Sequence, residues 1–65
     1  MSDKPRMAKA HSKLVADEYI RLGWTLRHKF YGRGDVEPYE YFFVWEGPGE
    51  PVGIDWKEFA ARVLK

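Results

Sequence analysis

The sequence contains no cysteine, and this absence removes two ways of stabilising a small protein. Disulfides cannot form, and the only histidines, His11 and His28, cannot complete the four-ligand site of a structural zinc ion. The longest apolar run, residues 42–45, is far shorter than the roughly 20 residues that span a bilayer. The polar start of the chain lacks the apolar segment of a secretory signal. We expect a cytoplasmic protein with no membrane segment, consisting of a disordered leader (residues 1–6) and one domain (residues 7–65).

Aromatic residues, in contrast, are abundant: they make up 17% of the 65 residues. A chain of this size buries only about 60% of the surface that its unfolded form exposes, so its core is thin. Large aromatic side chains bury more area per residue than other types. We therefore expect aromatic packing to provide the stability that disulfides give other small domains.

The net charge of +1 conceals an uneven distribution along the chain. Residues 1–33 hold eight basic and three acidic side chains, a net charge of +5, whereas residues 34–65 have a net charge of −4. Such asymmetry is typical of a basic patch that binds nucleic acid or an acidic partner. It also arises when the two halves of a fold neutralise each other, which is the interpretation that we favour.

The N-terminal third of the chain has the apolar spacing of a helix. Small and apolar side chains recur at intervals of three and four residues, which predicts a helix over residues 7–22. Gly23 would end this helix, because glycine adopts a left-handed backbone without a Cβ clash. Trp24 would then fold back against Tyr19.

Two strands are predicted in the middle of the chain. Apolar and polar residues alternate over residues 24–31, as in a strand with one face toward a core. Residues 39–46 form a second strand with apolar side chains on both faces. The short connection between them, rich in glycine, makes the two strands antiparallel neighbours.

The charges of the two strands predict which faces meet. Opposite charges on neighbouring strands stabilise a sheet, so Arg27 and Lys29 should share a face with the acidic residues of the second strand. These are Glu40 and Glu46. The alternating aromatic residues of the second strand would then face the core beside Phe30.

The C-terminal segment predicts a short edge strand over residues 52–54 and then a helix. Asp55 followed by Glu58 has the spacing of a capping box at a helix start. The residues that follow at helical spacing are apolar and are expected to be buried: Trp56, Phe59, Ala60, Val63 and Leu64. The predicted fold is therefore α+β in the order α-β-β-(β)-α. A small antiparallel sheet of two long strands and a short edge strand would be packed by an N-terminal and a C-terminal helix.

Catalytic motifs are scarce. The sequence has no cysteine nucleophile, and the patterns of dinucleotide, P-loop, zincin and EF-hand sites do not occur. We expect a non-enzymatic chain with no catalytic residue, no metal site and no small-molecule cofactor. His28, on the apolar face of the first predicted strand, has two interpretations. It is either a histidine at the edge of the core, which we favour, or a general base for phosphodiester cleavage.

The segment from Tyr19 to Tyr31, a helix end followed by Gly23, Trp24 and a strand, resembles the HicA family of small messenger-RNA-cleaving toxins. It is also similar to the double-stranded-RNA-binding domains, and the rest of the chain resembles both in element order alone. The resemblance implies RNA binding or cleavage. The glycine-serine-histidine step of HicA is missing, however, and the C-terminal helix lacks the lysine cluster with which RNA-binding domains begin theirs. Because a shared fold does not carry function, the resemblance defines an alternative hypothesis.

The surplus of apolar side chains favours a protein-binding domain. If helices cover one face of the sheet, Phe42 and Val44 on the other face, together with Tyr31, form a candidate patch for a protein partner or a homodimer. The alternative is a nucleic-acid-binding protein. Its candidate residues are Arg27, Lys29 and Arg33.

Overall fold

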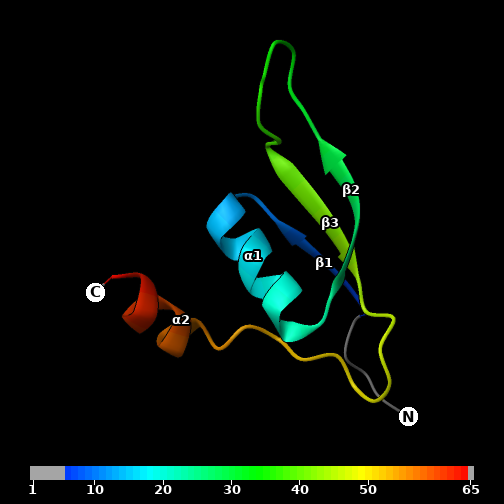
Figure 1. The fold of residues 1–65 in the computed structure, drawn as a ribbon, viewed down its shortest axis with the longest axis vertical. Helices are drawn as coiled ribbons and strands as arrows, with labels where there is room; N and C mark the ends of the chain where they lie inside the picture. The colour runs from blue at the N-terminus through cyan, green and yellow to red at the C-terminus, as the bar shows by residue number, and fades with distance from the viewer. Residues whose placement is uncertain (1–5, 65) are drawn as a thin grey trace.

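The computed structural model describes residues 6–64, which form a three-stranded sheet and two helices (Figure 1). In chain order the elements are β1 (Met7–Ala10), α1 (Lys13–Leu22), β2 (Thr25–Phe30), β3 (Glu40–Val44) and α2 (Trp56–Val63). The order in the sheet is β1-β3-β2, and β3 pairs antiparallel with both neighbours. β1 and β2 therefore run parallel to each other and are connected through α1. The predicted α+β class with a small antiparallel sheet is confirmed.

The first helix is shorter than predicted, because residues 7–10 form β1. Ser12 caps α1: its backbone is extended, and its hydroxyl accepts a hydrogen bond from the backbone N–H of Val15. β1 pairs with β3, and Ala10 is 1% exposed in the core. Pairing with a distant strand thus outweighs the helical propensity of this segment. The element order is β-α-β-β-α, so the predicted order α-β-β-(β)-α is wrong, and so is the likeness to HicA and RNA-binding domains in element order.

The predicted end of the first helix is confirmed. Gly23 has a left-handed backbone (φ 108°), and its N–H donates to the carbonyl of Ile20. The N–H of Trp24 donates to the carbonyl of Tyr19 at 3.0 Å, and the two rings pack edge to face with centroids 5.4 Å apart. The stop therefore places Trp24 over the core.

The predicted edge strand over residues 52–54 does not form. The carbonyl of Val52 accepts a hydrogen bond of 2.7 Å from the indole N–H of Trp24, so this segment is tied to the end of α1 instead of the sheet. The predicted cap of the second helix is confirmed, since the Asp55 carboxylate accepts the backbone N–H of Glu58. The third strand of the sheet is β1, from the other end of the chain.

The prediction that the second helix buries its apolar side is wrong. None of the residues of α2 is buried, and Trp56 is 56% exposed. The segment over residues 51–55 leads the chain past the end of α1, and α2 lies farther from the sheet than α1 does (Figure 1). The ion pair between Arg62 and Glu18 holds α2 beside α1.

The core lies between α1 and the sheet. It consists of Ala10, Ala16, Trp24, Tyr41, Phe43 and Trp45. Phe43 is fully buried, and the ring of Tyr19 lies 5.3 Å from it. The indole rings of Trp24 and Trp45 pack edge to face at 5.5 Å. Aromatic packing therefore dominates this core, as the composition predicts.

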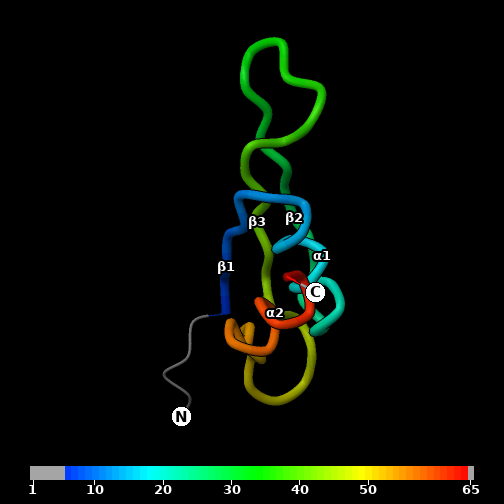
Figure 2. Tube along the Cα trace, turned by 90° about the vertical axis from the view of Figure 1, so that its left-hand side faces the viewer, coloured from blue at the N-terminus to red at the C-terminus, as the bar shows by residue number. Residues whose placement is uncertain are grey.

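Both helices lie on the same side of the sheet (Figure 2). The buried residues of β3, Tyr41 and Phe43, point toward this side, and Phe42 and Val44 point away from it, because side chains alternate along a strand. No helix of the part of the chain described here covers that second side.

Two phenylalanines test this arrangement. Phe43→Ala is expected to lower the free energy of unfolding by about 3–5 kcal/mol, because it empties the centre of the core. Phe30→Ala, at a residue that is 40% exposed, is expected to lower it by about 1 kcal/mol or less. Urea unfolding followed by tryptophan fluorescence measures both. Equal losses for the two variants would contradict a core on one side of the sheet.

Candidate functional site

A β-bulge between β2 and β3 decides which side chains reach the uncovered side of the sheet. Leu26 pairs with Phe43, but His28 pairs with Phe42, so the register shifts by one residue and Arg27 is the extra residue. Such a bulge moves all following side chains to the opposite face. His28 therefore lies on the side of Phe42, away from the core against which Leu26 packs.

Residues directly opposite each other in antiparallel strands share a face, so the register defines the uncovered surface. We call it the open face. It consists of Met7 and Lys9 from β1, Thr25, His28 and Phe30 from β2, and Glu40, Phe42 and Val44 from β3. The face that an antiparallel sheet turns to water normally carries polar side chains. Half of these positions are instead occupied by large apolar residues.

The apolar side chains of the open face are accessible. Met7 is 61% exposed and Phe30 is 40% exposed, whereas Phe42 and Val44 are half-buried because neighbours flank the central strand on both sides. The rings of His28 and Phe30 lie 5.9 Å apart at a tilt of 34°. The open face thus has an aromatic end on β2 and an aliphatic end at Met7.

The structure places two of the three candidate protein-binding residues on the open face. Phe42 and Val44 are there, but Tyr31 follows Phe30 directly and belongs to the opposite side, where it lines a hollow beside α1. Phe30 and Met7 also lie on the open face, and no pattern in the sequence indicates this position for either residue. Met7 falls within the predicted helix, and the bulge that turns Phe30 outward contains no glycine.

The candidate nucleic-acid residues do not come together. Arg27 forms an ion pair of 3.2 Å with Glu46, which confirms one of the predicted charge pairs. Lys29 lies opposite Tyr41 on the helix-covered side, so the prediction that it shares a face with Glu40 and Glu46 is wrong. Arg33 is exposed in the loop between β2 and β3.

The predicted core-facing position of His28 is also wrong. The imidazole is exposed on the open face, because the bulge at Arg27 turns it away from the core. The interaction that the structure gives it is the ring contact with Phe30.

The carboxylate of Glu40, at the rim of the open face, lies close to two basic side chains. Glu40 Oε1 lies 3.1 Å from His11 Nε2, and Glu40 Oε2 lies 3.9 Å from Lys9 Nζ. The Glu40 side chain is 22% exposed, less than either partner. Positive charge at this rim is therefore partly neutralised, and the accessible chemistry of the open face is mainly apolar contact.

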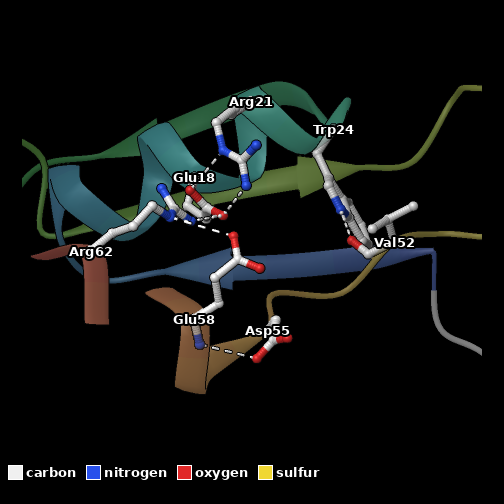
Figure 3. A network of polar contacts seen from close by, with 7 residues as sticks. All are labelled: Glu18, Arg21, Trp24, Val52, Asp55, Glu58 and Arg62. Carbon is white, nitrogen blue, oxygen red and sulfur yellow. Dashed lines mark hydrogen bonds and ion pairs between the residues drawn. The ribbon is translucent and has the colours of Figure 1, made fainter. Parts of the chain in front are cut away.

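A second cluster of charges joins the two helices. Glu18 of α1 is 5% exposed, and Arg21 donates two hydrogen bonds to its carboxylate, at 2.7 and 3.1 Å. Arg62 of α2 donates a third, at 2.8 Å (Figure 3). These donors, Arg21 first and Arg62 second, lower the pKa of Glu18 from its ordinary 4.5 to about 2. We interpret this cluster as the structural link between α1 and α2.

Comparison with known proteins adds no relative, because no family model, no curated protein and no solved structure matches the chain. Within residues 6–64, no group of three acidic or histidine side chains could hold a metal ion. No helix in the same range is long and apolar enough to cross a membrane.

The link between the helices predicts a response to acid. Because the pKa of Glu18 is lower in the folded protein than in the unfolded chain, its contribution to stability is complete above about pH 4.5. This contribution is lost as the pH falls from 4.5 through about 2. In Arg62→Ala the pKa of Glu18 is expected to rise, since one of the two cations is gone, whereas Lys57→Ala on the same helix is the matched control. Carboxyl ¹³C NMR measures the titration directly, and a Glu18 pKa near 4.5 in the wild type would contradict the link.

Proposed function

We propose that this chain is a small, non-enzymatic protein-binding domain that acts through the open face of its sheet. The observation that supports the proposal is the exposure of Met7 and Phe30 beside Phe42 and Val44, on the side opposite both helices. A contiguous apolar surface of this kind on a small domain is typical of an interaction site.

The partner covers the face with a complementary apolar surface. A specific interface buries on the order of 1,000 Å² or more, and its centre is apolar with aromatic anchors. Phe30 and Phe42 would be those anchors, and the ion pairs Lys9–Glu40 and Arg27–Glu46 would lie at the polar rim. A second copy of the chain is the simplest partner, and a different protein is the other.

Nucleic-acid binding is the alternative hypothesis. Aromatic rings on an open sheet face can stack with bases, but such surfaces interleave the rings with unpaired basic side chains. Here Arg27 pairs with Glu46, and Lys9 lies beside Glu40. The carboxylates repel phosphate, and for this reason we favour a protein partner. Cytoplasmic location remains a prediction from the sequence.

Adjacent aromatic residues provide a matched test. Phe30→Ser changes the open face, whereas Tyr31→Ser changes a residue of similar exposure that directly follows β2 and belongs to the opposite side. Sedimentation equilibrium measures self-association of the chain, and a quantitative pull-down measures its binding to a captured protein. Phe30→Ser is expected to weaken this association at least about tenfold, whereas Tyr31→Ser is expected to leave it unchanged.

Three results would contradict the proposal. One is that the wild-type chain stays monomeric at high concentration and that Phe30→Ser and Tyr31→Ser capture the same proteins. Another is unfolding of Phe42→Ser, which would make the open face part of the core. The third is tight binding to DNA or RNA oligonucleotides with a steep salt dependence, lost in the double variant Arg27→Glu, Lys29→Glu.

A further inference from the structure

β1 is an edge strand, and no other strand among residues 6–64 pairs with its outward backbone groups. The N–H of Trp45 donates to the carbonyl of Arg6, and backbone groups in an antiparallel pair point alternately toward and away from the partner strand. Ala8 and Ala10 therefore face β3, whereas the N–H and C=O groups of Met7 and Lys9 point to the free edge. Figure 2 shows β1 at the margin of the sheet. Such an edge can pair with one further strand.

An apolar groove lies beside this edge, on the helix-covered side of the sheet. Its volume is about 360 Å³, within the range of known ligand pockets. Residues 7–9 of β1 form one wall, the rings of Tyr19 and Trp24 form the second, and Pro51 and Gly53 close the end. A strand added to β1 would direct every second side chain into this groove.

The charged residues along the edge of β1 indicate which kind of segment would bind there. Arg6 and Lys9 are exposed along the same stretch of chain, and Lys9 is the only charged residue among the described residues that line the groove. The ion pair of Lys9 with Glu40, at 3.9 Å, is longer than the other ion pairs between described residues, so it leaves the ammonium group accessible to a second carboxylate. Pairing two copies of the chain through β1 would bring this positive stretch alongside its equivalent, which is unfavourable. An acidic segment is complementary to it instead.

We propose that the edge of β1 and the adjacent groove bind an extended segment of a partner protein that alternates apolar and acidic residues. The segment pairs with the free N–H and C=O groups of Met7 and Lys9, as in other cases of strand addition. Its apolar side chains enter the groove between β1 and Trp24, and its carboxylates lie near Lys9. This site shares Met7 and Lys9 with the open face, but it uses their backbone groups and the charge of Lys9 and needs neither Phe30 nor Phe42.

A short peptide of known composition tests the site. The probe is a blocked heptapeptide of alternating glutamate and valine, and its lysine–valine counterpart is the control for charge. The glutamate peptide is expected to bind in isothermal titration calorimetry and to slow hydrogen exchange of the Met7 and Lys9 amides at least about tenfold in NMR. The lysine peptide is expected not to bind.

Gly53 and Lys9 provide the variants. A side chain at Gly53 meets open space, so Gly53→Leu is expected to fold, fill the groove and weaken binding at least about tenfold, while Gly53→Ala has little effect. Lys9→Thr removes only a rim charge and is expected to weaken binding about fivefold or less. Lys9→Pro also removes the outward N–H and is expected to abolish binding.

Several results would overturn this inference: no binding of the glutamate peptide at millimolar concentration, equal binding of the lysine peptide, or binding unaffected by Gly53→Leu. Protection of the Met7 and Lys9 amides by self-association of the free chain would also overturn it, because a second copy would then occupy the edge. Phe30→Ser is expected to leave peptide binding unchanged, and Gly53→Leu to leave association through the open face unchanged. Failure of one site is therefore distinguishable from failure of the other.

Discussion

Burial of one side of β3 under α1 is the constraint on which the rest of this structure depends. Phe43 is fully buried at the centre of the sheet, in contact with Tyr19 of α1, and Trp24 and Trp45 extend the same cluster. β3 is the only strand of the described sheet with neighbours on both sides, so it determines the position of β1 and β2. A chain without disulfides thus concentrates its apolar contacts in one aromatic layer.

The same constraint produces the surfaces that remain available. Because strands alternate their side chains, burying Tyr41 and Phe43 commits Phe42 to the other side, and the bulge adds His28 and Phe30 to it. Both helices are on the buried side, so the open face has no cover from its own chain in the described range (Figure 2). The segment after β3 is hydrogen-bonded to Trp24 and adds no strand to the sheet, so β1 remains an edge strand.

Local signals in the sequence predicted local features, and features set by distant contacts were missed. Gly23 and Asp55 act through neighbours within four residues, so the end of α1 and the start of α2 could be predicted. Residues 7–10 have helical propensity and become a strand only because β3 lies beside them. The positions of Phe42 and Val44 on the open face could be predicted from the alternation of side chains along β3. The position of Phe30 could not, because no glycine marks the bulge at Arg27.

Nuclear Overhauser contacts between side chains show whether the bulge at Arg27 turns the aromatic end of β2 to the open face. We expect contacts from His28 to Phe42 and from Phe30 to Glu40, with Lys29 contacting Tyr41. A regular ladder continued from the pairing of Leu26 with Phe43 would instead place Phe30 on the core side. Contacts from Phe30 to the buried aromatic rings, with none to the open face, would show that β2 has no such bulge and that the open face lacks its aromatic end.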